Sequence, residues 1–350
     1  MWRVGVDIGG TFTDGIAFDD QSGSVRHAKA PSTPRDFAEG VLNVIDALVS
    51  DCREMSLFVH GTTVGLNSLL QGRLLRLGLV ATRGFRDIIE LGRGNRVNIY
   101  DPLYQYPAPL IPRRMRYEVD ERIDSAGQVL APLDEEEVRR VISQMVSEGA
   151  EGIVISFINS YVNPAHERAA RRIVESLYPG LPVVCSTDLT REYREHERTC
   201  TAIINLGISR DVRTYLTSLE AGLARRGYSG PVLVMQPNGG AVTSSVAKER
   251  PVWTLGSTLA GGVIGLEVLS DVLGIKDLIG ADMGGTSFDV EVVLGGRSRS
   301  VGSFKVRTPA SGADGYPVLV PTLDAHSIGA GGGSIAWVDT GGLLHVGPES

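Results

Sequence analysis

The stretch Asp7–Asp14 reads DIGGTFTD, and the stretch Asp282–Asp289, far downstream, reads DMGGTSFD. Both follow a short apolar run, which is how a buried strand would carry the first aspartate to its tip. The paired glycines allow a sharp turn in which backbone N–H groups approach an anion closely, and the Thr and Ser hydroxyls add donors. We therefore interpret each stretch as a phosphate-binding loop with one carboxylate that could hold a metal ion.

A simpler interpretation of these stretches is disfavoured by their repetition. Gly-Gly-Thr could be an ordinary hairpin turn, with the aspartates as turn-forming residues. The whole order Asp-x-Gly-Gly-Thr-x-x-Asp occurs twice, however, and this favours two related lobes that face one polyphosphate. The loop residues expected to contact phosphate are Gly9, Gly10, Thr11, Thr13, Gly284, Gly285, Thr286 and Ser287.

The aspartates at the predicted strand ends are candidate metal ligands. Carboxylate oxygens of Asp7 and Asp282 could hold Mg²⁺ directly or through its waters, while phosphate oxygens complete the shell. Asp14 and Asp289 each follow seven residues later. Across a hairpin, these two could return to the same cleft or simply cap the second strand.

A third candidate region begins at His60. The histidine is followed by Gly61, Thr62 and Thr63 at a predicted strand-to-helix junction, where hydroxyls and free helix N–H groups can receive an anionic or carbonyl ligand. A lone histidine is more often structural, so the residues alone leave its role open. Thr62 and Thr63 are candidate substrate contacts on the same argument.

Two further groups carry weaker predictions. Asp324 and His326 would lie on one face of a strand, which allows a second divalent metal ion or a hydrogen-bonded pair behind a ligand. Arg93 and Arg96 lie near glycine turns and could bind a substrate carboxylate bidentately. The alternative for the arginines is a solvated surface.

Composition limits the class of protein. With 42% hydrophobic and 21% charged residues, the 350-residue chain is typical of a soluble globular protein. Its net charge of −7 gives no reason to expect nucleic acid or an anionic membrane as partner. Three widely spaced cysteines argue against a disulfide framework and a cysteine zinc site, and no apolar run is long enough for a membrane span. We expect a cytoplasmic protein.

Strand-like runs alternate with amphipathic helical patterns, which predicts an α/β fold. Residues 1–276 should form a first lobe, in which residues 92–132, rich in Pro, Tyr and Arg, are an inserted loop or small subdomain. Residues 277–350 should begin a second lobe. At about seventy residues it is shorter than an ordinary domain of about 100–150, so we expect it to be incomplete. Helices are predicted over residues 63–71, 134–148, 195–226 with a break near 207–209, and 260–270.

The paired loops resemble those of the actin, Hsp70 and sugar kinase superfamily of two-lobed ATPases. The sequences of these motifs are more similar to those of the hydantoinase A family, which includes ATP-dependent hydantoinases, 5-oxoprolinases and subunits of acetone and acetophenone carboxylases. The stretches that carry this resemblance span nearly the whole chain, and they are Gly5–Asp14, His60–Asn67, Asp282–Asp289 and Asp324–Ile335.

The resemblance implies an enzyme that uses ATP and Mg²⁺ to phosphorylate a carbonyl or enolate oxygen of a cyclic amide or ketone, so that water or bicarbonate can attack. It also implies a larger hydantoinase B-type partner subunit. It places His60 beside the cleft, and the candidate catalytic residues are therefore Asp7, His60 and Asp282. Family members later supply a glycine-rich adenosine loop that has no equivalent here, and they usually read Ser-Gly-Pro-Ala-Gly-Gly where this chain has Ser257–Gly262, STLAGG. A small-molecule kinase and a non-catalytic partner-binding fragment remain alternatives.

Overall fold

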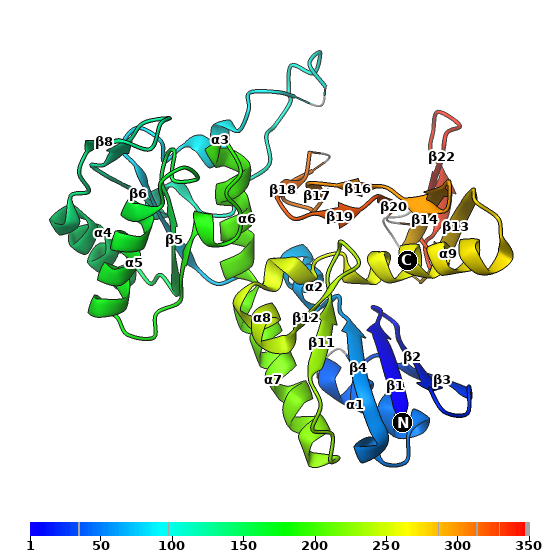
Figure 1. The fold of residues 1–350 in the computed structure, drawn as a ribbon. Helices are drawn as coiled ribbons and strands as arrows, with labels where there is room; N and C mark the ends of the chain where they lie inside the picture. The colour runs from blue at the N-terminus through cyan, green and yellow to red at the C-terminus, as the bar shows by residue number, and fades with distance from the viewer. Residues whose placement is uncertain (34–35, 97, 286, 313, 329, 347–350) are drawn as a thin grey trace.

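The computed structural model describes residues 1–33, 36–96, 98–285, 287–312, 314–328 and 330–346. Figure 1 shows three bodies: a sheet with the N-terminus, a second sheet flanked by helices, and an antiparallel region that follows a long helix. Strands and helices alternate through the first two bodies, as the sequence predicts. In these described ranges, no helix is long and apolar enough to cross a membrane.

The first body is a six-stranded sheet in the order β12-β11-β4-β1-β2-β3. β1 pairs with β2 as an antiparallel hairpin and with β4 in parallel, so the strand that carries His60 ends beside the strand that carries Asp7. Apolar residues alternate along β1, and this pattern places Val4, Val6 and Ile8 in the core. The strands are β1 (Trp2–Ile8), β2 (Phe12–Asp19), β3 (Val25–Pro31), β4 (Met55–Gly61), β11 (Val232–Met235) and β12 (Ala241–Thr243).

Helices cover this sheet because each has one apolar face. Asp36 caps the first of them by accepting a hydrogen bond from the Ala38 N–H, and the helix buries Val41, Val44, Ile45 and Leu48. A Cβ at Gly15 of β2 would lie 2.3 Å from Val44, so glycine permits the close approach of helix and sheet. The helices of this body are α1 (Phe37–Leu48), α2 (Val64–Leu70), α7 (Ser209–Arg225) and α8 (Ser244–Glu249).

The second body has its own parallel sheet, in the order β10-β9-β5-β6, and its own hydrophobic core. Every residue of β5 and β9 is buried, because α4 and α5 cover one face of the sheet and α6 the other (Figure 1). The main elements are α3 (Ile88–Leu91), α4 (Glu135–Ser147), α5 (Ala165–Leu177), α6 (Glu195–Gly207), β5 (Leu77–Thr82), β6 (Arg116–Val119), β9 (Gly152–Ser156) and β10 (Val183–Cys185). The predicted helix break at 207–209 is confirmed, since α6 ends at Gly207 and α7 begins at Ser209.

The second body begins and ends at neighbouring points. The Leu75 N–H donates a hydrogen bond to the Gly207 carbonyl at 3.0 Å, so the chain enters and leaves this body side by side. Within residues 92–132, for which an inserted loop or small subdomain is predicted, residues 116–119 form β6 and join the sheet; the bounds of the insertion stay a prediction. The polar sequence Arg-Tyr-Glu-Val carries no apolar pattern that would predict a buried edge strand.

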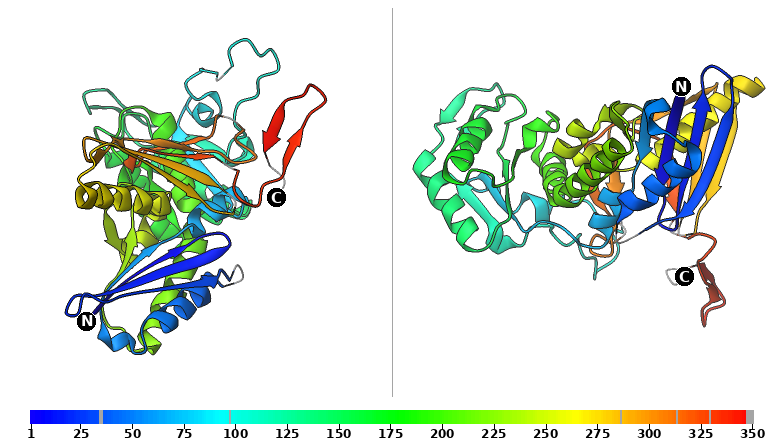
Figure 2. Two further views of the ribbon diagram at one scale, coloured as in Figure 1. Left: turned by 90° about the vertical axis from the view of Figure 1, so that its right-hand side faces the viewer. Right: turned by 90° about the horizontal axis from the view of Figure 1, so that it is seen from below.

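The third body follows α9 (Ser257–Leu273) and is built from antiparallel strands. Its largest sheet contains β13 (Leu278–Met283), β14 (Phe288–Leu294), β15 (Arg297–Ser298) and β20 (Ala325–Ile328). A short pair in the second body joins β7 (Arg122–Ile123) and β8 (Val129–Ala131) (Figure 1). The remaining pairs of the third body are β16 (Ser300–Val301) with β19 (Thr322–Leu323), β17 (Phe304–Val306) with β18 (Tyr316–Val318), and β21 (Ala336–Val338) with β22 (Leu344–Val346). The last pair stands away from the rest of the molecule (Figure 2). The domain boundary at residue 277 stays a prediction.

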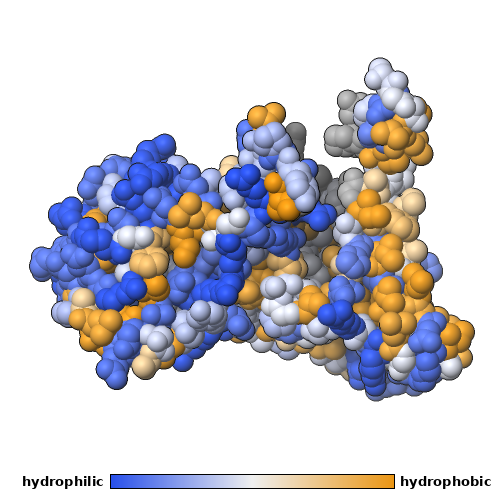
Figure 3. Space-filling view, turned by 90° about the horizontal axis from the view of Figure 1, so that it is seen from above, coloured by the Kyte–Doolittle hydropathy of each residue, from blue (hydrophilic) through white to orange (hydrophobic). Residues whose placement is uncertain are grey.

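Apolar side chains gather on the surface of this third body (Figure 3). We call the exposed large apolar residues of α9, β13 and β14 the α9 face; they are Val268, Leu269, Val272, Leu273, Ile279, Met283, Val292 and Leu294. Surfaces of this kind are typical of interaction sites.

Candidate phosphate-binding site

The two repeated stretches form the same hairpin. In β1–β2, Asp7 lies opposite Asp14, and in β13–β14, Asp282 lies opposite Asp289. Each turn is closed by the first glycine, since the Gly9 N–H donates to the Phe12 carbonyl and the Gly284 N–H to the Ser287 carbonyl, both at 2.9 Å. The repeat in sequence is therefore a repeat in backbone structure.

The two turns also face each other. A Cβ at Gly285 would lie 3.2 Å from Oγ1 of Thr11, so the second turn closely approaches the first. The N–H groups of Gly332 and Gly333 donate to the carbonyls of Gly284 and Gly285, at 2.9 and 3.0 Å. These bonds engage the carbonyls of the second turn from behind, which suits a turn whose N–H groups are to receive an anion.

Asp7 lies in an environment that disfavours its negative charge. Burial raises its pKa to about 6; the Thr258 hydroxyl, which donates to Oδ1 at 3.1 Å, lowers the pKa in part, and the nearby charges of Asp14 and Asp282 raise it further. A Cβ at Gly61 would lie 2.5 Å from Oδ1, so this glycine leaves room for the carboxylate. A cation beside Asp7 would offset both the burial and the repulsion.

Carboxylates of the third body add to this acidic region. Asp289 accepts a hydrogen bond from Ser287 on Oδ2 at 3.3 Å, while its Oδ1 is buried with no donor among the described residues. Glu291 is also buried, and burial together with Asp282 and Asp289 raises its pKa. The sequence reasoning missed Glu291, although its spacing from Asp289 places both on one face of β14.

Among the described residues, no three His, Cys, Asp or Glu side chains are grouped as metal ligands. The donors present nevertheless fit Mg²⁺, which is usually held by one or two carboxylates together with waters and substrate phosphates. Such an ion would give the buried, unpaired Oδ1 of Asp289 a partner. It would also stabilise the charged form of Asp7, whose pKa is raised.

Helix α9 connects the two acidic groups. Near its start, Thr258 binds Asp7, and Ser257 exchanges hydrogen bonds with the backbone of Thr62 at 3.1 Å. One turn later, a Cβ at Gly262 would lie 2.2 Å from Oε1 of Glu291, so a larger residue there would displace the Glu291 carboxylate. The departure from Ser-Gly-Pro-Ala-Gly-Gly therefore does not disrupt the helix, and it places Thr258 against Asp7.

The surroundings of His60 in this structure do not support the expected catalytic role. The ring is fully buried; its Nδ1 lies 3.0 Å from the Val6 carbonyl and its Nε2 lies 2.5 Å from the Tyr215 hydroxyl. Because a carbonyl only accepts, Nδ1 carries the proton and Nε2 accepts from Tyr215. Burial lowers the pKa of His60 to about 4, so the residue is a neutral core histidine.

The two threonines that follow His60 differ in burial and in hydrogen-bond partners. Thr62 is buried and its Oγ1 accepts from the Val64 N–H at 3.2 Å, so it supports the start of α2 and does not face a substrate, contrary to prediction. Thr63 is half-buried and donates to the Ile8 carbonyl at 3.1 Å, next to the first turn. Thr13 is also a correction: it is buried against Ser32 at 3.2 Å, on the face of β2 opposite Asp14. Thr286 lies outside the described residues.

The remaining candidates do not join the two turns. His326 is exposed, 3.8 Å from Asp324, and the pair gathers no third ligand among the described residues, so the structure does not support a second metal site there. Arg93 binds Glu197 at 2.6 Å in a separate cavity. The guanidinium of Arg96 lies 5.7 Å from the centre of the Tyr104 ring.

Comparisons with known proteins identify one family over most of this chain. Residues 3–178 match the family model described as hydantoinase/oxoprolinase N-terminal region, and residues 198–350 match the model described as hydantoinase/oxoprolinase. An uncharacterized protein of Methanocaldococcus jannaschii is 38% identical over 100% of this chain and 52% of its own length. Caprolactamase subunit alpha of Pseudomonas jessenii is 35% identical over 100% of this chain and 51% of its own.

A nucleotide-free structure of acetone carboxylase, from work on ATP-dependent acetone carboxylation, matches with a TM-score of 0.85 and 31% identity. The match covers 100% of this chain and 51% of that one, and it confirms the predicted two-lobed α/β fold of the actin, Hsp70 and sugar kinase type. The chain spans about half the length of the relatives that it matches.

Proposed function

Because the chain belongs to the hydantoinase/oxoprolinase family, we propose that it supplies phosphate-binding machinery to an enzyme that uses ATP to activate a cyclic amide or ketone. The observation that carries the proposal is the pair of hairpins that share the same strand pairing and the same closing hydrogen bond, and whose turns face each other beside Asp7. Relatives described as caprolactamase and ATP-dependent acetone carboxylase support the choice of carbonyl substrates.

In this proposal, the backbone N–H groups of Gly10, Thr11 and Gly285 receive phosphate oxygens, and the Thr11 hydroxyl adds a donor. Asp7, Asp282 and Asp289 would hold Mg²⁺, which neutralises charge on the phosphates. Thr258 fixes the Asp7 carboxylate through its hydrogen bond. Phosphoryl transfer depends mainly on such positioning and charge neutralisation, so no nucleophilic side chain is required.

The chemistry follows from the substrate class. The carbonyl or enolate oxygen attacks the γ-phosphorus, the bond from that phosphorus to the ADP oxygen breaks, and ADP leaves. In a hydrolase, water then attacks the activated carbon of a cyclic amide, the C–N bond breaks so that the ring opens to an amine and an acyl phosphate, and a second water releases phosphate from the acyl phosphate. In a carboxylase, the phosphoryl group of the enol phosphate passes to the hydroxyl oxygen of bicarbonate and leaves as phosphate, while the enolate carbon forms a bond to the carbon dioxide that remains.

We propose a partner of the hydantoinase B type. Caprolactamase subunit alpha is by its name one subunit of several, and the α9 face offers an apolar surface for another chain. The same face favours the second candidate function, a non-catalytic role in partner binding. A small-molecule kinase differs from both, since it would release a stable phosphate ester.

Calorimetry with Mg-ATP tests the proposal. We expect saturable binding to the chain and its loss in an Asp7→Asn, Asp282→Asn double variant, because both carboxylates near the phosphates are neutralised. Asp46→Asn is the matched control, since Asp46 on α1 pairs at 2.7 Å with Arg226, which follows α7 directly. Absence of binding by a folded chain would contradict nucleotide binding by these residues and would favour the partner-binding role.

Product analysis separates the enzymatic alternatives. The chain, with its partner subunit when that is identified, would be incubated with Mg-ATP and either a lactam or a ketone. Release of inorganic phosphate together with a ring-opened or carboxylated product supports the proposal. Accumulation of a phosphate ester would instead identify a kinase.

A further inference from the structure

The β21–β22 hairpin has one face made only of apolar side chains. In its register Ala336 lies opposite Val346, and Val338 lies opposite Leu344, so all four side chains project to the same side. All four are exposed, Leu344 by 71%. Apolar residues that alternate in this way along a strand are typical of a face that packs against another layer.

The opposite face of the hairpin already has its own contacts. Trp337 stacks on His345 with 4.4 Å between the ring centres, and His345 Nε2 lies 2.7 Å from a carboxylate oxygen of Asp339. The whole hairpin stands away from the rest of the molecule (Figure 2). An isolated two-stranded hairpin is at best marginally stable in water. The apolar face therefore needs a covering layer that the described part of this chain does not supply.

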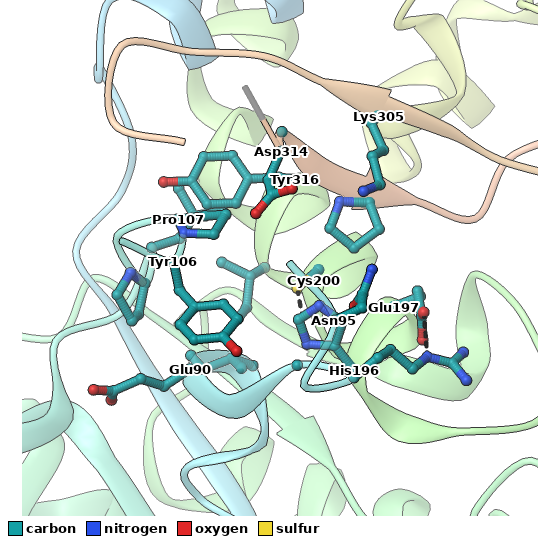
Figure 4. A pocket seen from close by; sticks show the side chains of 18 residues that line it. Glu90, Asn95, Tyr106, Pro107, His196, Glu197, Cys200, Lys305, Asp314 and Tyr316 are labelled. Atoms are coloured by element: carbon teal, nitrogen blue, oxygen red, sulfur yellow. Dashed lines mark hydrogen bonds and ion pairs between the residues drawn. The ribbon is translucent and has the colours of Figure 1, made fainter. Parts of the chain in front are cut away.

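A second hairpin of the same body shows the contrast. β17–β18 buries Val306, Tyr316 and Val318 in the first hydrophobic core. The Tyr316 hydroxyl also donates to the Ala108 carbonyl at 2.6 Å, and Figure 4 shows this tyrosine against the irregular segment after α3. An exposed apolar face is therefore not a general property of the hairpins in this body.

A second apolar face lies on the sheet of β13, β14 and β20. On one side of this sheet Glu291 and Val293 are buried, and a Cβ at Gly262 of α9 would meet Glu291. Side chains alternate along a strand, so Val292 and Leu294 point away from α9. We call the exposed large apolar residues on that side the outer sheet face; they are Ile279, Met283, Val292, Leu294 and Ile328.

The outer sheet face has the same character as the apolar face of the hairpin. Its members other than Ile328 belong to the α9 face, and Ile279 is 75% exposed. His326 points to the same side, but it lies on β20, which pairs only with β14 among the described strands, so it would remain at the rim of an interface. Two apolar sheet faces can pack about 10 Å apart without desolvation of a charge.

The hairpin is held so that it does not fold back onto the outer sheet face of its own chain. Gly332 and Gly333 are bonded to the carbonyls of the second Gly-Gly turn, and the Ser334 N–H donates to the Gly331 carbonyl at 2.9 Å. Only Ile335 lies between this pinned turn and β21. A tight chain reversal uses about two loop residues, so the hairpin is directed outwards, where a neighbouring molecule can receive it.

We propose that two copies of this chain exchange their β21–β22 hairpins, so that the apolar face of each hairpin packs on the outer sheet face of the other copy. Both halves of the interface are present on one chain, and the exchange is symmetric, as in most homodimers. A stable interface buries more than about 1,000 Å², and reciprocal exchange supplies the same contact twice. The inference requires no nucleotide and no reaction, so it does not rest on the proposed function.

Sedimentation velocity over a concentration series tests the dimer with the unaltered 350-residue chain. We expect a reversible equilibrium of monomer and dimer. Leu344→Glu should weaken it about a hundred-fold, because each dimer contains the buried charge twice and each copy costs about ten-fold. Leu130→Glu is the matched control, since Leu130 is a similarly exposed leucine on β8 of the second body.

Two results of this experiment would overturn the inference. One is a monomer at every concentration, which would leave both apolar faces for a different protein. The other is a dimer that Leu344→Glu does not weaken, which would place the interface elsewhere. The unaltered chain decides the first point even if a variant does not fold.

Disulfide trapping tests which surfaces meet. Leu344→Cys and Leu294→Cys would be made in separate chains, one of them tagged, and the mixture would be oxidised; Cys52, Cys185 and Cys200 are buried and should not react. We expect a mixed disulfide between the two chains, in excess of any formed by Leu344→Cys alone. Absence of that excess would refute the exchange. A chain with both changes should also link to a second chain, and an internal disulfide would show instead that the hairpin folds back.

Discussion

At the residue scale, the glycine that ends β4 controls the position of the central carboxylate. Gly61 lies opposite Asp7 in the parallel pairing of β1 and β4, and a side chain there would meet the carboxylate oxygen at 2.5 Å. Real Cβ atoms do not come so close to a neighbour, so a larger residue must displace Asp7 or the strand.

We therefore expect Gly61→Ala to weaken Mg-ATP binding by at least about ten-fold, since the carboxylate is moved from the phosphates. Calorimetric titration would measure the change. The control is Gly5→Ala, on the neighbouring strand β1, where a Cβ would lie an ordinary 3.5 Å from Ile16. Equal affinities in both variants would show that the position of Asp7 does not matter for nucleotide binding.

Because His60 is buried and neutral, we expect the unfolding free energy of the chain to fall at acidic pH. Its pKa is about 4 in the folded chain and about 6.5 when unfolded, so between these values the unfolded chain binds the extra proton. This group's contribution is complete above pH 6.5, and about 3 kcal/mol of unfolding free energy should be lost as the pH falls to 4.

Urea denaturation between pH 4.5 and 7.5 would measure the slope. His60→Gln should flatten it and should also lower stability at pH 7, because Val6 and Tyr215 lose a well-placed partner. His27→Gln, at an exposed position on β3, should keep the original slope. An unchanged slope in His60→Gln would refute the assignment of a neutral buried ring.

At the scale of elements, α9 has two different sides. Its buried positions, including Ala260 and Val263, face the sheets, and its start contacts Asp7 through Thr258. Its C-terminal half leaves Leu269 and Val272 exposed, by 50% and 76%. Apolar positions exposed to this extent contribute little to the stability of the chain that carries them.

We expect Leu269→Gln with Val272→Gln to change unfolding free energy by less than about 1 kcal/mol and to reduce self-association in sedimentation velocity experiments. In contrast, Val263→Gln should destabilise the chain by several kcal/mol, roughly 3, because it buries an amide without partners. A large loss of stability in the double variant would mean that the α9 face packs within the folded chain.

Elements were easier to predict than the orientation of side chains. The hairpins at both repeats, α2, α4 and the break between α6 and α7 follow from apolar periodicity and glycine placement, which are local properties of the sequence. His60 and Thr62 were placed at the correct junction, but which way a side chain points depends on tertiary packing. The separate cavity at Glu197 could not be predicted, because its walls come from segments far apart in the chain.

At the scale of the whole molecule, the chain has two separate hydrophobic cores. One lies around the first sheet, with α1 and α7, and the other lies within residues 75–206. Of these two cores, only the first contains a strand of a repeated Asp-x-Gly-Gly-Thr hairpin. Cores of this kind can unfold as separate cooperative units.

Scanning calorimetry should therefore resolve two transitions, and Mg-ATP should raise the midpoint of only one. Ile153→Ala, in the second core, should lower the midpoint that does not respond to nucleotide, at a cost of about 2–5 kcal/mol. Val234→Ala, in the first core, should lower the other. A single transition affected by both variants would show that the cores unfold together.

The hydrogen bond between Leu75 and Gly207 has an evolutionary consequence. Because residues 75–206 leave and rejoin the first body at adjacent points, the whole segment can be replaced without moving β1, β4 or α7. A lineage could therefore exchange or remodel this module while the proposed nucleotide site is inherited unchanged. Recombination at these two positions would give chimaeras in which the proposed phosphate site and the second body are passed on independently.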